Sequence, residues 1–324
     1  MEPFEYVAAN DEQQAITAGA RGAYIAGGTN LVDYMRLEVV QPAAVIDITR
    51  LPFTAIEETP GGGVRIGALA RNEDVARDPL IVQRYPVLGE AILSGASPQL
   101  RNQATTGGNL LQRTRCPYFR DPQVAACNKR QPGSGCAALG GHNRSHAVLG
   151  TSTSCIATHP SDQNVALVAL GAIAHTRGPG GARAIPIGEL YTLPGERPDI
   201  ETVLRPGELI SAVELPALPF ARRSHYVKVR DRAAFAFALA SAAVALDLDG
   251  DHIRDARVAL GGVATVPWRS AAAERALIGR RAGPEAFAAA AEAALAGAVT
   301  QPSNRFKVEL ARRTLVRALE EVAR

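Results

Sequence analysis

Four cysteines are the residues whose type and spacing most clearly suggest chemistry. Cys116, Cys127, Cys136 and Cys155 lie in one segment, and no cysteine occurs elsewhere in the chain. Thiolates are soft ligands that bind zinc and iron–sulfur clusters. The intervals are Cys-x10-Cys, Cys-x8-Cys and Cys-x18-Cys, without the Cys-x2-Cys knuckle typical of structural zinc sites. The pattern suits a cubane cluster better than zinc, but spacing alone leaves a cluster, zinc and two disulfides open.

Three histidines, His142, His146 and His159, lie in or near the same segment and could replace a cysteine as a ligand. A lone loop histidine is more often a surface or hydrogen-bonding residue. We therefore predict that none of the three binds the metal.

Two glycine-rich segments could hold a phosphate group. The first reads Ala26-Gly27-Gly28-Thr29-Asn30-Leu31, and about 75 residues later the second reads Arg101-Asn102-Gln103-Ala104-Thr105-Thr106-Gly107-Gly108-Asn109-Leu110. A loop between a strand and a helix offers unpaired backbone N–H groups to an anion. A glycine pair alone more often serves an ordinary tight turn, so only the combination is informative.

The elements that must position these loops begin with a small α/β unit. The first 47 residues predict strand, helix, strand, helix, strand, with helices over 10–20 and 31–37 and strands over 22–25 and 44–47. A strand at 63–66 and helices at 72–78 and 86–93 begin a second segment, which leads into the second glycine loop.

The cysteine segment itself has almost no periodicity. Residues 113–154 are rich in Gly, Pro, Asn, Arg, Ser and Cys, and a structureless loop of this length needs something other than a hydrophobic core to order it. A bound cluster would do so. Regular patterning resumes at 165–173 and continues to a strand at 209–215.

Beyond a linker at 216–219 the pattern changes. Strands are expected over 225–230, 242–247 and 256–261, followed by helices over 284–298 and 307–322. We therefore predict a domain boundary between residues 217 and 218, and a C-terminal domain of antiparallel sheet packed with helices.

Composition excludes several classes of protein. The 324 residues are 47% hydrophobic and 21% charged, which is ordinary globular usage, and the net charge of +3 is scattered rather than clustered. Nucleic acid is therefore not an expected partner. No apolar run reaches the roughly 20 residues of a membrane helix, and residues 1–9 lack the basic start of a secretory signal. We expect no membrane insertion and no export signal of its own.

The two glycine segments, followed by Pro160-Ser161-Asp162, resemble the FAD-binding subunits of the xanthine dehydrogenase and aldehyde oxidoreductase family, the molybdenum hydroxylases. The resemblance covers essentially the whole chain and implies an α+β protein. Its first part would be a PCMH-type FAD-binding domain, similar to vanillyl-alcohol oxidases, over residues 1–217, with lobes of about 1–55 and 56–217. The second lobe would contain a cluster-binding insertion at 113–155. Residues 218–324 would form a CO-dehydrogenase-flavoprotein-like C-terminal domain.

The resemblance also implies cofactor contacts. The FAD pyrophosphate would be wrapped by a first set of residues, Tyr24, Ile25, Ala26, Gly27, Gly28, Thr29, Asn30, Leu31 and Val32, and by Thr105, Gly108 and Asn109 of the second loop. Asp162 would accept hydrogen bonds from ribitol or ribose hydroxyls, the alternative being a helix N-cap. Ile210 would pack on the isoalloxazine, with core packing as the alternative. Lys228 would lie near the flavin ring, with an exposed strand lysine as the alternative.

The insertion departs from the plain xanthine dehydrogenase pattern. It is similar to the insertion in the flavin subunits of 4-hydroxybenzoyl-CoA reductase and of bacterial periplasmic aldehyde oxidoreductase, and it looks closer to the latter. In both, four cysteines hold a [4Fe-4S] cluster. The resemblance therefore implies one such cluster on Cys116, Cys127, Cys136 and Cys155.

The implied function is electron transfer within an oxidoreductase complex. A molybdenum-cofactor subunit would oxidise an aldehyde to a carboxylic acid, a [2Fe-2S] subunit would pass the electrons on, and FAD on this chain would deliver them to an external acceptor. No catalytic acid or base is expected here. Alternatives are the flavin subunit of a related enzyme such as 4-hydroxybenzoyl-CoA reductase, a free-standing flavin reductase or oxidase, and a zinc- or disulfide-stapled assembly module. We expect assembly in the cytoplasm and export to the periplasm with a signal-bearing partner.

Overall fold

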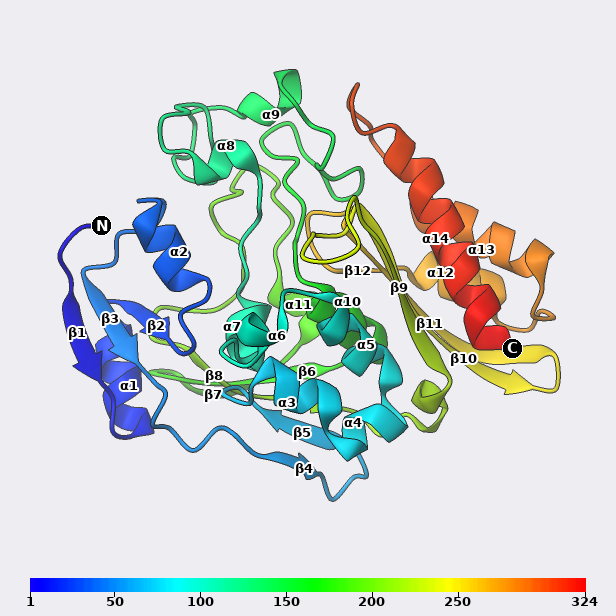
Figure 1. Cartoon of the computed structure of the whole chain (residues 1–324), viewed down its shortest axis with the longest axis horizontal. Helices are drawn as coiled ribbons and strands as arrows, with labels where there is room; N and C mark the ends of the chain where they lie inside the picture. The colour runs from blue at the N-terminus through cyan, green and yellow to red at the C-terminus, as the bar shows by residue number, and fades with distance from the viewer.

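Three separate sheets organise the chain, and the computed structural model describes all 324 residues (Figure 1). The first sheet is parallel, in the order β1-β3-β2, and comprises β1 (Glu5–Ala8), β2 (Ala23–Ile25) and β3 (Ala44–Asp47). Helices α1 (Glu12–Gly19) and α2 (Leu31–Arg36) connect these strands. The predicted alternation of strands and helices over the first 47 residues is therefore confirmed.

The second sheet is antiparallel, in the order β4-β5-β8-β6-β7. Its strands are β4 (Ile56–Glu58), β5 (Val64–Gly67), β6 (Ile173–Gly178), β7 (Gly181–Pro186) and β8 (Leu209–Leu215). The predicted strand at 209–215 is the central one, and all but one of its residues are buried. Strands that face packed layers on both sides read as continuous apolar runs, which is why the sequence identified this one.

Four helices pack on this second sheet and its neighbour: α3 (Asn72–Arg77), α4 (Pro79–Arg84), α5 (Pro86–Ser94) and α10 (Asp162–Leu170). Every residue of α10 is buried, because this helix lies between the second and third sheets and contacts α5, β10 and β11. Ser161 caps its N-terminus by accepting a hydrogen bond from the Asn164 backbone, and Gly171 ends it with a left-handed φ of 69°.

The third sheet is antiparallel, in the order β12-β11-β10-β9, with β9 (Ser224–Val229), β10 (Ala240–Asp249), β11 (His252–Gly261) and β12 (Trp268–Arg269). One face is covered by α12 (Ala271–Leu277), α13 (Pro284–Leu295) and α14 (Phe306–Ala323), which form the layer at the right of Figure 1. The prediction of a C-terminal antiparallel sheet packed with helices is confirmed. A short 3-10 helix, η1 (Pro219–Arg222), occupies the predicted linker.

The insertion forms its own layer near the N-terminal end of α14, at the top of Figure 1. Its only helices are the single turns α8 (Pro117–Arg120) and α9 (Ala137–Gly140). Its buried apolar cluster is small and includes three of the four cysteines. Arg130 supplies further order by donating to the backbone carbonyls of Phe119, at 2.8 Å, and Val124.

The remaining single-turn or short helices are α6 (Pro98–Arg101), α7 (Thr106–Leu110) and α11 (Ile187–Leu190). None of the helices in the chain combines the length and apolar character needed to span a bilayer.

Candidate functional site

A cleft of about 360 Å³ lies between the turn after β2, helices α5, α7 and α10, and strand β9. Its walls include five residues predicted from the sequence: Thr29, Asn30, Asn109, Asp162 and Lys228. They come from the turn after β2, from α7, from α10 and from β9. Residues separated by almost 200 positions therefore meet at one cavity large enough for a cofactor.

The two glycine loops pack directly against each other beside this cleft. A Cβ atom at Gly27 would lie 1.8 Å from the backbone oxygen of Gln103, so no other residue fits there without moving the second loop. Gly28 has a left-handed φ of 70°. In the second loop, Thr105 begins α7 and its side chain accepts from the Gly108 backbone at 3.3 Å. The two loops therefore fix each other's backbone, and together they form the phosphate cradle that the sequence predicts.

A buried ion pair lies at the other end of the cleft. Lys228 Nζ donates to Asp162 Oδ2 at 2.8 Å, and the Tyr226 hydroxyl donates to Asp162 Oδ1 at 2.7 Å. The side chains of Lys228 and Asp162 are 5% and 9% exposed. The exposed-lysine alternative is therefore wrong. The N-cap alternative for Asp162 is also wrong, because Ser161 is the residue that caps α10.

Other predicted residues lie near the cleft without lining it. Tyr24 donates its hydroxyl to the backbone oxygens of Gly207 and Ala15, at 2.9 and 3.2 Å, and burial raises its pKa to about 12. Ile210, on strand β8, is buried in the largest hydrophobic core cluster. The cleft lining likewise omits a further set: Ile25, Ala26, Gly27, Gly28, Leu31, Val32, Thr105 and Gly108. The cofactor contacts assigned to these residues and to Ile210 stay predictions.

The cleft also contains residues that sequence reasoning missed. Asn72 Oδ1, Gln163 Oε1 and Arg115 Nε are buried atoms without a hydrogen-bond partner, and all three side chains belong to the cleft lining. A buried polar atom left without a partner costs about 1 to 3 kcal/mol. Such atoms grouped around one cavity mark it as built for a polar ligand. Gln163, which follows Asp162, and Arg115, which precedes Cys116, each had a predicted neighbour that could have drawn attention to it, whereas Asn72 had none.

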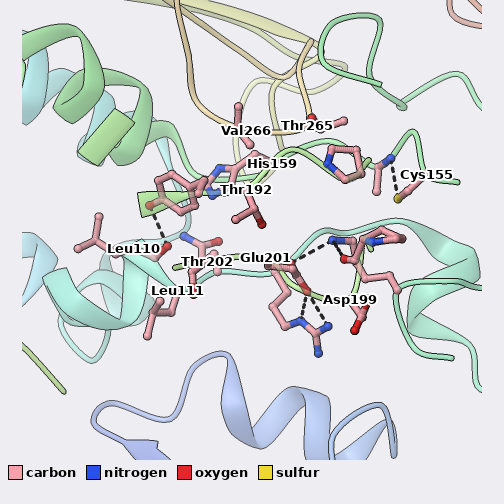
Figure 2. Close-up of a pocket in the computed structure, with 17 residues that line it drawn as sticks. Leu110, Leu111, Cys155, His159, Thr192, Asp199, Glu201, Thr202, Thr265 and Val266 are labelled. Carbon is pink, nitrogen blue, oxygen red and sulfur yellow. Dashed lines mark hydrogen bonds and ion pairs between the residues drawn. The ribbon is translucent and has the colours of Figure 1, made fainter. Parts of the chain in front are cut away.

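A second cavity of about 380 Å³ is lined by residues of α7, of the insertion and of the segment 191–202 (Figure 2). Gln112 lines both cavities, and Cys155 lines the second one. Glu201 points into it and accepts from Arg113 at 2.6 Å, while Lys129 lies 3.3 Å from the same carboxylate. Apart from Cys155, the sequence did not predict this cavity.

Two aromatic side chains form the inner wall of this second cavity. The Tyr191 hydroxyl donates to the Leu110 backbone oxygen at 3.0 Å, and the His159 ring meets the Tyr191 ring edge-on with centroids 4.9 Å apart (Figure 2). Burial lowers the pKa of His159 to about 3, so its imidazole is neutral at physiological pH. His159 does not line the cavity that the four cysteines share.

All four cysteines line a third, small cavity within the insertion, as their clustering in sequence predicted. Cys127 and Cys136 face each other across an isolated antiparallel bridge, and no disulfide joins any of the four. Most of the other lining is apolar. Burial raises the pKa of the Cys116 thiol to about 12. No three or more His, Cys, Asp or Glu side chains lie close enough together to hold one metal ion.

One histidine also reaches this cysteine cavity. His146 Nε2 lies 3.2 Å from Cys116 Sγ, and burial lowers the pKa of His146 to about 4. Its other ring nitrogen, Nδ1, is buried without a partner. His142 is not part of the cavity lining. The prediction that no histidine binds a metal stays a prediction, with His146 now the nearest candidate.

Comparison with known proteins places this geometry in a family. Residues 2–218 match the family model for the FAD binding domain in molybdopterin dehydrogenase, and residues 225–322 match the CO dehydrogenase flavoprotein C-terminal domain. The chain is 50% identical to the aldehyde oxidoreductase FAD-binding subunit PaoB of Escherichia coli, over 99% of this chain and 98% of the relative. It is 26% identical to the glyceraldehyde dehydrogenase medium chain of Sulfolobus acidocaldarius, over 86% and 82%.

Solved structures agree with these matches. Carbon monoxide dehydrogenase from Hydrogenophaga pseudoflava superposes with a TM-score of 0.75 and 27% identity, covering 99% of this chain and 98% of the other. The Cu,Mo-CO dehydrogenase shares the fold with a TM-score of 0.77, over 100% and 99% of the two chains, at 23% identity. The predicted family and fold class are confirmed, and the match to an FAD binding domain supports FAD as the cofactor of this chain. The chain belongs to the FAD-binding oxidoreductase subunits of the molybdenum hydroxylase family.

Proposed function

We propose that this chain is the electron-transfer subunit of a molybdenum-cofactor aldehyde oxidoreductase, and that it holds a [4Fe-4S] cluster in addition to FAD. The observation that carries the proposal is 50% identity, over nearly the full length of both chains, to a flavin subunit of an aldehyde oxidoreductase. The four cysteines around one cavity support the cluster.

FAD supplies one- and two-electron redox chemistry when bound. The residues of this chain bind and orient it. Gly27 and Gly28 let the backbone approach the pyrophosphate, and Thr29, Asn30 and Asn109 add polar side chains at the cleft wall. At the far end, Lys228 places a positive charge that favours a reduced, anionic ring, and Asp162 fixes the position of that lysine.

The cysteine cavity offers the four thiols that a polynuclear cluster needs as ligands. In a zinc site, four sulfurs lie about 2.3 Å from one metal and so converge on a point. Here the four thiols share a cavity but no three of them converge in that way. In a cubane, each thiolate binds a different iron, so four cysteines around one cavity can supply all of its protein ligands. The buried Cys116 thiol also needs nearby positive charge to ionise, and bound iron would supply it.

The reaction sequence assigns substrate chemistry to another subunit. We propose that a molybdenum-cofactor subunit oxidises the aldehyde, that a [2Fe-2S] subunit carries the electrons to FAD here, and that an external acceptor removes them. The acidic side chains of the cleft support this division, because both are paired: Asp162 with Lys228, and Asp33 with Arg115. No free acid or base faces the cleft in position to act on an aldehyde. Export with a signal-bearing partner is part of the same proposal.

Aldehyde oxidation by the separate parts tests this assignment. The isolated, FAD-loaded chain should not oxidise aromatic or aliphatic aldehydes with an artificial electron acceptor, whereas the complex copurified with its molybdenum and [2Fe-2S] subunits should. A complex in which Lys228 is replaced by Met should keep aldehyde binding at the molybdenum subunit but pass electrons to the acceptor more slowly. Aldehyde oxidation by the chain alone would contradict the proposal.

A further inference from the structure

Arg115 joins the cysteine insertion to the FAD cleft. It is the residue before Cys116, and its side chain lines the cleft. Its guanidinium donates to Asn30 Oδ1 at 3.3 Å and to Asp33 Oδ2 at 3.2 Å. Both acceptors belong to the first glycine loop or to the helix that follows it. A residue of the insertion therefore reaches across to the loop that is predicted to hold the pyrophosphate.

The guanidinium retains capacity for another acceptor. Its Nε is buried and has no hydrogen-bond partner. The Phe237 ring lies 5.0 Å from the guanidinium carbon and covers it from one side. The side chain is 28% exposed. A partly enclosed guanidinium with an unused N–H is suited to a phosphate oxygen, which accepts charge-assisted hydrogen bonds.

The local charge also favours an anion. Arg120 donates to both oxygens of Asp33, at 2.8 and 3.2 Å, while Arg115 donates to one of them. Two guanidinium groups therefore share a single carboxylate, which leaves one positive charge in excess beside Thr29 and Asn30. Arg120 is not part of the cleft lining, so Arg115 is the member of this pair that presents its charge to the cleft.

We propose that Arg115 binds the pyrophosphate of FAD and couples FAD affinity to the loading of the cysteine cavity. The second half rests on the proposed [4Fe-4S] site. The physical link is short: Arg115 is adjacent to Cys116, which lines the cysteine cavity, and the backbone N–H of Cys116 donates to the Thr114 hydroxyl at 3.2 Å across Arg115. The insertion has little apolar core of its own. A metal cluster would order it and hold Arg115 in its binding position, and FAD would favour metal loading in return.

Substitution of the two arginines tests the FAD contact. Arg115→Met in the full chain should weaken FAD binding about 10- to 100-fold, as expected for a lost charge-assisted hydrogen bond to an anion. Arg120→Met, the matched control, should change it less than about 3-fold. Arg115→Lys keeps the positive charge but loses the forked guanidinium, so its loss of FAD affinity should lie between those of the two Met variants. Flavin fluorescence titration of the FAD-free chains measures the dissociation constants. Equal losses in the two Met variants, or none in Arg115→Met, would overturn the contact.

A double-mutant cycle tests the coupling. Cys127 lines the cysteine cavity and not the cleft. Cys127→Ser should lower iron content and weaken FAD binding, but it should have little further effect in a chain that already carries Arg115→Met. Wild-type chain produced under iron limitation provides the same comparison if Cys127→Ser does not fold. Additive effects would overturn the coupling. A wild-type chain without iron would overturn the cluster and the coupling together, while the difference between Arg115→Met and Arg120→Met would still decide the contact.

Discussion

The buried pair of Asp162 and Lys228 gives the sharpest stability prediction. It joins α10 to β9 across the cleft at 2.8 Å, and the two side chains are 9% and 5% exposed. Removing one partner leaves an unpaired buried charge, which costs about 3 to 5 kcal/mol. Each kcal/mol lowers the Tm of a domain of this size by about 2 to 4 °C. In the FAD-free chain, Asp162→Asn and Lys228→Met should therefore each lower the Tm by about 6 to 20 °C.

The variant that combines both substitutions separates the interaction between Asp162 and Lys228 from the cost of leaving either charge unpaired. Once both charges are gone, the remaining amide still accepts a hydrogen bond from the Tyr226 hydroxyl, so Asp162→Asn with Lys228→Met should recover most of the loss. Differential scanning calorimetry of the four FAD-free chains measures the cycle. A double variant whose loss equals the sum of the two single losses would refute the reasoning, as would single variants that melt like the wild type.

Three other changes test separate parts of the structure. Gly27→Ala should abolish tight FAD retention on gel filtration, because the added Cβ would overlap the backbone of the second loop. In the control, Gly61→Ala, the added Cβ has no atom within 4 Å, so this variant should keep FAD. FAD retention in both variants would contradict the cradle. Burial lowers the pKa of Lys307 to about 7, while an unfolded lysine titrates near about 10.4, so the unfolded chain binds more protons between these values. The free energy of unfolding, measured by urea titration, should therefore rise from pH 7 to pH 10, and it should rise less in Lys307→Met. An equal rise with pH in the two proteins would be contrary evidence. Tyr34→Phe removes a hydroxyl that donates to the Arg113 carbonyl and accepts from the Arg113 N–H. The free energy of unfolding, measured in urea, should fall by about 1 to 3 kcal/mol. An unchanged urea midpoint would contradict this prediction.

The sequence could predict those elements whose periodicity is set by local burial. Strand β8 lies at the centre of its sheet and is almost continuously apolar, so its bounds of Leu209–Leu215 were predicted correctly. The hairpin of β6 and β7 was missed, because its residues include His175, Arg177 and Arg183, and it is stabilised by pairing with β8 rather than by an alternating pattern of its own. Long-range pairing of this kind leaves no mark within a short window of sequence.

In the candidate site, too, features with a local sequence pattern could be predicted, and features that depend on long-range contacts could not. The glycine loops carried a local motif, and the cysteines were identified by type and clustering, so both could be found from the sequence. Arg115 could not, because its importance depends on reaching Asn30, 85 residues away. The partners of Asp162 were equally hidden, since Tyr226 and Lys228 come from the next domain along the chain. Contacts made across sheets require the fold before they can be seen.

Metal and flavin content of the purified chain test the central claim most directly. The account predicts one FAD and about four iron atoms per chain, with visible flavin bands above a broad iron–sulfur absorption, and loss of the iron in each of the single substitutions of Cys116, Cys127, Cys136 and Cys155 by Ser. Electron paramagnetic resonance of the dithionite-reduced protein should show the reduced cluster. A chain that contains FAD but zinc, or no metal, in an anaerobic preparation would contradict the claim.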